Sequence, residues 1–161
     1  MTASVYIESS IISYLTSRPS RDVIKAGRQA ITYDWWLQSK GRYEVYISVL
    51  VEEEISGGDP AAAAKRLEAV ADIPNIAITA EAEWLADALV LSKAVPDNSV
   101  RDALHIAIAA TQGIDYLLTW NFKHINNAET KALIARVIEN QGWLCPILCS
   151  PEELGANDDE E

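Results

Sequence analysis

Hydrophobic and polar positions follow two different periods along the chain. Short runs rich in β-branched and aromatic residues are typical of strands, whereas longer stretches repeat their apolar residues every three to four positions, as helices do. The predicted strands cover residues 4–7, 43–48, 76–78, 116–119 and 143–148. The predicted helices cover about residues 11–15, 20–39, 49–56, 60–71, 79–93, 100–112 and 128–140.

Strands that alternate with helices indicate βαβ units, and therefore a parallel sheet with helices on both faces. We predict an α/β fold built as one domain over residues 1–150. In open sheets of this kind, functional sites lie beyond the carboxyl ends of the strands. The residues that directly follow each strand are therefore the first candidates for chemistry.

Polar side chains that can cap a helix precede several of the predicted helices. Hydroxyl or carboxylate oxygens at such positions accept hydrogen bonds from the first backbone N–H groups of the helix. Proline at the first helical position is a further start signal. The predicted caps are Ser9 or Ser10, Ser20, Ser48, and Asp59 followed by Pro60.

The composition is that of a globular domain with a full hydrophobic core. The chain has 161 residues, of which 49% are hydrophobic, so it needs no disulfide or structural metal to fold. It shows neither a secretory leader nor an apolar run of about 20 residues, so we expect no membrane span and a cytoplasmic location. Cys145 and Cys149 are then expected as separate thiols, with a disulfide as the alternative.

The net charge of −11 is concentrated at one end of the chain. Six acidic residues and no basic residue lie between Glu152 and Glu161, which predicts an acidic, solvated and disordered tail over residues 151–161. The remaining 18 acidic and 13 basic residues give the body a net charge of −5, with no basic stripe of the kind that grips phosphates unaided. If this chain binds nucleic acid, a metal ion would supply the missing positive charge.

Four oxygen-bearing side chains stand at the ends of separate predicted elements. Glu8 directly follows the first strand, and Glu54 shares a helical face with apolar neighbours. Asp102 lies in the first turn of its helix, and Asn121 falls two residues beyond the strand at 116–119. We expect these four residues to converge on one point.

Convergent carboxylates suit a hard divalent cation such as Mg²⁺ or Mn²⁺. Crowded carboxylates repel each other unless a cation neutralises them, and a metal can acidify water and clamp phosphate oxygens without a histidine base. Each residue also has a purely structural interpretation. Glu8 could be a capping residue at a strand end, Asp102 could form a capping box with Ser99, and Asn121 could be a turn residue. Glu54, like Glu52 and Glu53, could be an acid that the dipole at a helix start favours.

Four segments together resemble the motifs of PIN-domain nucleases, most closely the VapC-type toxins of bacterial toxin–antitoxin pairs. They appear in the family's order, and the resemblance extends from Val5 to about Leu148. The segments are Val-Tyr-Ile-Glu-Ser-Ser at 5–10, Ile-Ser-Val-Leu-Val-Glu-Glu-Glu-Ile at 47–55, Asp-Ala-Leu-His-Ile-Ala at 102–107 and Tyr-Leu-Leu-Thr-Trp-Asn-Phe at 116–122.

This resemblance implies a three-layer α/β/α fold with a central, mainly parallel sheet, and a Mg²⁺- or Mn²⁺-dependent endoribonuclease whose products carry a 5′-phosphate and a 3′-hydroxyl. It also implies a homodimer and a cognate antitoxin protein that blocks the site. Glu8, Glu54 and Asp102 match the family's three metal-binding acids, with Glu8 in place of the usual Asp. Asn121 stands where many members carry a fourth Asp; the loss of that charge favours a one-metal site.

Several further residues are candidates for substrate binding. Ser9 follows the first acid, where the family often places a hydroxyl, and Thr119, at the end of a predicted strand, could also touch the site. Arg18 and Arg21 flank a Pro-Ser turn and could contact RNA phosphates, because arginine recognises phosphate with two parallel hydrogen bonds. Capping, strand ending and ordinary surface charge are the structural alternatives for these four residues. His105 and His124 are expected to be structural, with His105 bonded to nearby backbone.

Two other classes of function remain as alternatives. A catalytically weak or inactive PIN-like module would bind RNA or a partner protein without cleaving, and Asn121 in the fourth acid position motivates this hypothesis. A phospho-accepting signalling domain also clusters acids at strand ends. It requires a pair of acids near the first strand and an Asp at the end of a middle strand, and the sequence shows neither.

Overall fold

A computed structural model describes residues 2–155 and shows a four-stranded sheet in which every neighbouring pair is parallel. The spatial order is β2-β1-β3-β4, so β1 lies in the interior of the sheet. Its residues Val5, Tyr6 and Ile7 are fully buried, which explains why this run has no polar face. The strands are β1 (Ser4–Ile7), β2 (Glu44–Tyr46), β3 (Tyr116–Leu118) and β4 (Ile147–Cys149).

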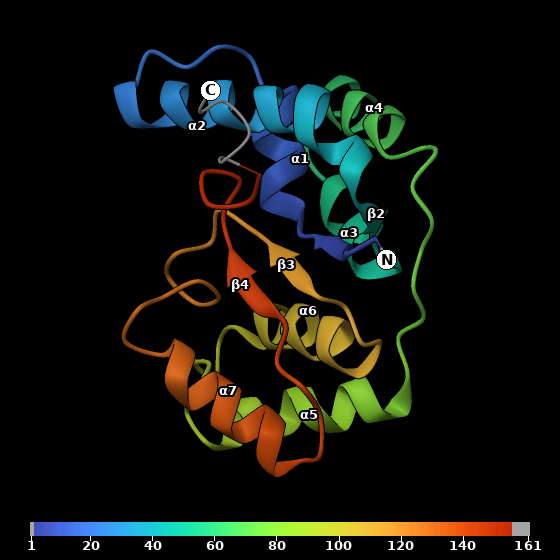
Figure 1. The fold of residues 1–161 in the computed structure, drawn as a ribbon. Helices are drawn as coiled ribbons and strands as arrows, with labels where there is room; N and C mark the ends of the chain where they lie inside the picture. The colour runs from blue at the N-terminus through green and yellow to red at the C-terminus, as the bar shows by residue number, and fades with distance from the viewer. Residues whose placement is uncertain (1, 156–161) are drawn as a thin grey trace.

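Helices cover both faces of this sheet, and the predicted α/β/α class is confirmed (Figure 1). Helices α1 to α4 form one layer, and α5 to α7 form the other. Within residues 2–155, no helix is both long enough and apolar enough to cross a membrane. The helices are α1 (Ser9–Thr16), α2 (Val23–Asp34), α3 (Val49–Ile55), α4 (Pro60–Ala69), α5 (Ala80–Leu91), α6 (Val100–Thr111) and α7 (Lys131–Asn140), with a π-helix η1 (Trp35–Ser39) and a 3₁₀ helix η2 (Lys40–Arg42) after α2.

The strand register brings the residues after β1 and β3 side by side. Ile7 pairs with Leu118, and Leu118 pairs with Cys149. The ladder continues one residue further, because the Glu8 N–H donates to the Leu118 carbonyl (3.1 Å) and the Thr119 N–H donates to the Cys149 carbonyl (2.9 Å). Glu8 and Thr119 are therefore fixed at the same carboxyl edge of the sheet.

Local signals predicted some boundaries and missed others. Asp59 caps α4 through Ala62 N–H, and Cys145 and Cys149 are separate thiols, as predicted. The predicted strand at 76–78 is wrong, because only an isolated bridge between Ile47 and Asn75 forms there.

The serines predicted as caps have other roles. Helix α2 begins at Val23 and is capped by Asp22 rather than Ser20, whose backbone N–H donates to Gln29. Ser9 and Ser10 lie inside α1, and Ser48 precedes α3 without a side-chain cap. The hydroxyls of these three residues instead bond to the side chains of the candidate site described below.

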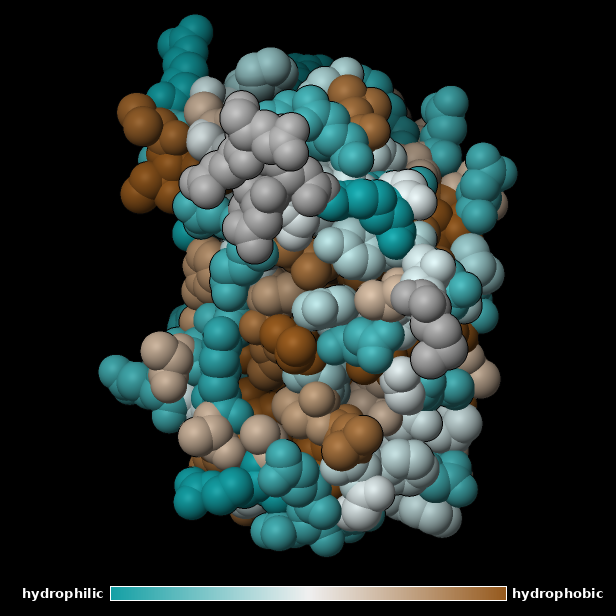
Figure 2. Space-filling model, in the orientation of Figure 1, coloured by the Kyte–Doolittle hydropathy of each residue, from teal (hydrophilic) through white to brown (hydrophobic). Residues whose placement is uncertain are grey.

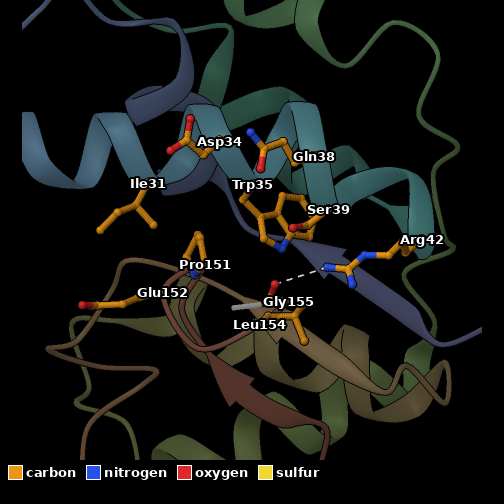
Figure 3. A pocket seen from close by; sticks show the side chains of 10 residues that line it. All are labelled: Ile31, Asp34, Trp35, Gln38, Ser39, Arg42, Pro151, Glu152, Leu154 and Gly155. Carbon is orange, nitrogen blue, oxygen red and sulfur yellow. Dashed lines mark hydrogen bonds between the residues drawn. The ribbon is translucent and has the colours of Figure 1, made fainter. Parts of the chain in front are cut away.

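The first residues of the predicted tail belong to the folded domain. Pro151 and Leu154 are buried, and the turn that contains them packs near η1 around a pocket of about 390 Å³ (Figure 3). Gly155 has a φ of +83°, and a Cβ there would lie 2.6 Å from the Arg42 guanidinium. The expectation of a solvated tail from residue 151 is therefore wrong for residues 151–155, and the acidic residues 158–161 lie outside the described part of the chain.

On the face seen in Figure 2, hydrophilic residues cover much of the helical layers, and hydrophobic residues gather in the band between them. A buried hydrogen bond links α2 to the segment that follows β3. The Trp120 indole N–H donates to the Thr32 hydroxyl (2.8 Å), which itself donates to the Arg28 carbonyl (2.6 Å). This bond fixes α2 against the segment that follows β3.

We predict that Thr32→Val lowers the free energy of unfolding by about 1–3 kcal/mol, because the buried Trp120 N–H loses its acceptor. Thr32→Ser keeps the hydroxyl and is the matched control, with an expected loss of about 0.8 kcal/mol for one methyl group. Urea unfolding of the three proteins measures the difference. Equal stability of the wild type and Thr32→Val would contradict the role of this bond.

Candidate metal centre

Glu8 is a buried carboxylate that two hydroxyl groups hold in place. Only 6% of the residue is exposed, at the junction where β1 ends and α1 begins. Its Oε1 accepts hydrogen bonds from Ser10 Oγ (2.5 Å) and Thr119 Oγ1 (2.6 Å). Because Thr119 is fixed by the sheet and Ser10 by the first turn of α1, the carboxylate has a defined orientation.

Glu54 meets this edge from helix α3. Its Oε1 accepts from Ser9 Oγ (2.6 Å) and from His105 Nε2 (2.5 Å), and 24% of its side chain is exposed. Burial of the carboxyl would by itself raise its pKa. The hydrogen bond and charge of His105, together with the Ser9 hydrogen bond, outweigh that effect and hold the pKa of Glu54 below its usual value. Glu54 is therefore a carboxylate at neutral pH.

His105 is fully buried and bonded on both sides of its ring. Its Nδ1 lies 2.7 Å from the Tyr6 hydroxyl, which lies 2.8 Å from Ser48 Oγ. Burial raises the pKa of Tyr6 well above its ordinary value, so the phenol keeps its proton. A neutral His105 with its proton on Nε2 donates to Glu54 and accepts from Tyr6, whereas a doubly protonated ring donates to both.

Glu8, Glu54 and His105 form the candidate metal centre, because their ligand atoms all lie within 4.8 Å of one another. Each carboxylate accepts its hydrogen bonds on Oε1, and no donor within residues 2–155 bonds to Oε2 of Glu8 or of Glu54. Each carboxylate therefore has an oxygen available for a cation. Carboxylate ligands suit Mg²⁺ and Mn²⁺, and an imidazole ligand suits Mn²⁺ and Zn²⁺. The three residues could hold one divalent ion with the His105 proton on Nδ1, which then donates to Tyr6, so that Nε2 carries no proton and can face the ion.

Asp102 borders this group but is not one of its three members. It lies one helical turn before His105 on α6, and its Oδ2 bonds to His124 Nδ1 (2.8 Å). Asp102 and Glu54 line the same surface pocket of about 470 Å³. Glu8 and Glu54 therefore meet as expected, while α6 presents His105 to Glu54 and presents Asp102 to His124, so the role of Asp102 as a metal ligand stays a prediction.

The other predicted residues lie in three different settings. Asn121 Oδ1 accepts from the His124 backbone N–H (3.0 Å) and so shapes the turn after β3. Ser9 and Thr119 bond directly to Glu54 and Glu8, so both hydroxyls belong to the site. Arg18 and Arg21 are exposed in the connection between α1 and α2.

Sequence reasoning missed four residues that complete the arrangement: Tyr6, Ser10, His105 and His124. Tyr6 resembled an ordinary core residue of a buried strand, and Ser10 resembled a helix cap. His105 was expected to bond to backbone, which is wrong, since its partners are the side chains of Tyr6 and Glu54. Its spacing of three residues from Asp102 on a helix was the one available signal, because such residues share a face.

Comparisons of the chain with models of known protein families and with curated proteins found no match. The candidate metal centre therefore rests on its own geometry and chemistry.

We predict that this centre binds Mn²⁺ through the three residues. Glu8→Gln, Glu54→Gln and His105→Asn should each weaken binding about tenfold or more, equivalent to about 1.4 kcal/mol, by isothermal titration calorimetry. Asp102→Asn should have a smaller effect, and Asp87→Asn, which changes an exposed acid on α5, should have none. A larger effect of Asp102→Asn than of His105→Asn would contradict the assignment of His105.

We further predict that Glu54 makes stability depend on pH in chelator. Since the pKa of Glu54 is lower in the folded than in the unfolded state, its ionised form stabilises the fold at neutral pH. This contribution is lost as the pH falls below the ordinary carboxyl range and through the lowered pKa. The difference in unfolding free energy between wild type and Glu54→Gln should therefore shrink on acidification. A difference that stays constant from neutral to acidic pH would contradict the lowered pKa.

Proposed function

We propose that this chain is a metal-dependent endoribonuclease of the PIN-domain type that hydrolyses RNA phosphodiesters. The observation that carries the proposal is the convergence of Glu8, Glu54 and His105 at the carboxyl edge of a parallel sheet. Ligand sites in open α/β sheets lie at this edge. The two acids come from segments about 45 residues apart in sequence, so the local needs of one helix or strand do not explain their meeting.

The order of the elements also supports this proposal. The first acid follows β1, the second lies in α3, Asp102 opens α6, and Asn121 follows β3. This is the order of the four motifs that the sequence shares with PIN-domain nucleases. His105 adds a ligand one turn into the third motif.

Each residue of the site has a defined task in this proposal. Glu8, Glu54 and His105 would hold the ion, with Ser10 and Thr119 orienting Glu8. The ion would supply positive charge for the scissile phosphate and would lower the pKa of a water molecule.

The surroundings of these ligands support the same task. Tyr6 and Ser48 fix the far side of the His105 ring, as partners of metal-binding histidines commonly do. Asp102, which is 21% exposed, adds negative charge to the pocket that it shares with Glu54 and so attracts cations there.

We propose further that the chain is the toxin of a toxin–antitoxin pair. In that role it acts as a homodimer in the cytoplasm, and a cognate antitoxin protein blocks the metal centre. The resemblance of the four motifs to VapC-type toxins supports this part of the proposal. Co-expression with the product of a short neighbouring gene tests it, since the antitoxin should co-purify and suppress cleavage.

We predict that the purified protein cleaves RNA with Mg²⁺ or Mn²⁺ and leaves 5′-phosphate ends. Glu8→Gln should reduce the rate about 100-fold or more, because a ligand of the ion is lost. Glu8→Asp, which restores the family's usual residue, should retain more activity than Glu8→Gln, and Asp87→Asn should retain all of it.

Two outcomes would contradict this proposal. Cleavage that persists in excess chelator would exclude the metal-dependent reaction. RNA or antitoxin binding without metal uptake and without cleavage would instead select the inactive binding module.

A further inference from the structure

The positive charge of this acidic protein is concentrated in the segment that links α1 to α2. Between residues 9 and 33 the chain carries Arg18, Arg21, Lys25 and Arg28 against one acid, Asp22, whereas the rest of the chain has a net charge of −14. No carboxylate in residues 2–155 forms an ion pair with any of these four cations. Basic residues elsewhere do pair, as Lys93 does with Asp97 and Arg101 with Glu53.

Part of this segment forms a pocket of about 420 Å³ that no acid lines. Arg18 and Lys25 contribute its cations, and its other groups are hydroxyls and one amide: Ser13, Tyr14, Ser17, Ser20 and Gln29. Tyr14 also lines an adjacent pocket of about 330 Å³ together with Tyr33, which is 55% exposed. Cations, hydroxyl donors and accessible aromatic rings are the groups that bind the phosphates and bases of a single strand.

A chain of contacts leads from this pocket to the candidate metal centre. The Arg28 guanidinium donates to the Tyr14 hydroxyl (3.4 Å) and lies over the rings of Trp120 (5.5 Å) and Phe122 (5.1 Å). The Trp120 backbone N–H donates to Ser10 Oγ (2.9 Å), which donates to Glu8. Arg28 thus lies between the pocket and the centre.

The length of α1 sets the scale of this path. The helix begins at Ser9, beside the metal centre, and ends at Thr16, beside the pocket. Eight residues of helix span about 12 Å, a distance that a few nucleotides of an extended strand cover.

We propose that Arg18, Lys25 and Arg28 form an RNA track that guides single-stranded RNA along the α1–α2 face to the metal centre. This proposal rests on the proposed function and names its substrate path. Arg18 and Lys25 contact phosphates in the pocket, and Tyr14 and Tyr33 offer rings to the bases. Arg28, whose guanidinium lies near two aromatic rings, contacts the phosphate nearest to the centre. Its planar guanidinium suits a phosphate better than a lysine ammonium does.

The test measures binding of a labelled single-stranded RNA by fluorescence anisotropy, in chelator so that no cleavage occurs, over a series of salt concentrations. Arg18→Gln/Lys25→Gln removes two charges from the track. Lys131→Gln/Arg136→Gln removes two charges from α7, in the opposite layer, and is the matched control. Arg28→Gln and Arg28→Lys separate loss of the charge from loss of the planar group.

We expect the track variant to weaken binding about tenfold or more at low salt and to reduce the slope of log K against log salt by about 1.4, the value for two lost contacts with a single strand. Arg28→Lys should bind more tightly than Arg28→Gln but less tightly than the wild type. The α7 control should stay within about twofold of the wild type. Polyglutamate should not displace the RNA, because it has no bases to stack on the tyrosines.

Three results would overturn the track: no RNA binding by the wild type at low salt, an equal effect of the two double variants, or displacement of RNA by polyglutamate. Thermal unfolding checks that the variants fold, and Arg18 and Lys25 are both exposed, so their replacement should leave stability unchanged. The outcome is separate from that of the proposed function. Binding through the track without metal-dependent cleavage would refute the nuclease alone, whereas cleavage with unchanged binding by the track variant would refute the track alone.

Discussion

The organisation of this protein depends on the meeting of two carboxylates where water is scarce. The ligand atoms of Glu8 and Glu54 lie within 4.8 Å of each other, and two full negative charges at that separation repel by about 3–4 kcal/mol at an effective dielectric constant of about 20. The parallel sheet fixes Glu8, and the packing of α3 fixes Glu54. The fold therefore sets the backbone positions of both residues, and the groups around the two carboxylates offset the repulsion.

The surroundings do so with hydroxyl groups and one imidazole. Ser10 and Thr119 donate to Glu8, and Ser9 and His105 donate to Glu54. On each carboxylate, both hydrogen bonds go to Oε1. The Oε2 atoms of Glu8 and Glu54 therefore form a face of acceptors that no donor within residues 2–155 satisfies. Such a face, together with His105, could hold a divalent cation.

The strands and helices could largely be predicted from their hydrophobic periods, because burial decides both. The strand predicted at 76–78 does not form, because the chain there makes only one isolated bridge, between Asn75 and Ile47. The serines failed for another reason. A serine after a strand satisfies either a helix terminus or a nearby side chain, and for Ser9 and Ser10 the three-dimensional position of Glu54 and Glu8 decides between them.

The third member of the candidate metal centre shows most clearly what sequence spacing cannot predict. Asp102 and His105 lie three residues apart on α6 and share one face, so sequence spacing cannot separate them. The rotation of α6 against the sheet places His105 in the interior and Asp102 at the rim, and that rotation is set by packing of the whole α5–α6 pair.

The distribution of charge follows from the same constraint. A site built from acids repels a polyanion, so an enzyme that cuts RNA here needs cations near the site that do not neutralise the acids. Cations placed among the carboxylates would pair with them and displace a metal ion. The α1–α2 segment avoids this outcome, because Arg28 lies over two aromatic rings and no acid among the described residues lines the pocket that holds Arg18 and Lys25. In the proposed enzyme, separation of the two charges onto different surfaces would let one chain attract both a metal ion and a phosphate backbone.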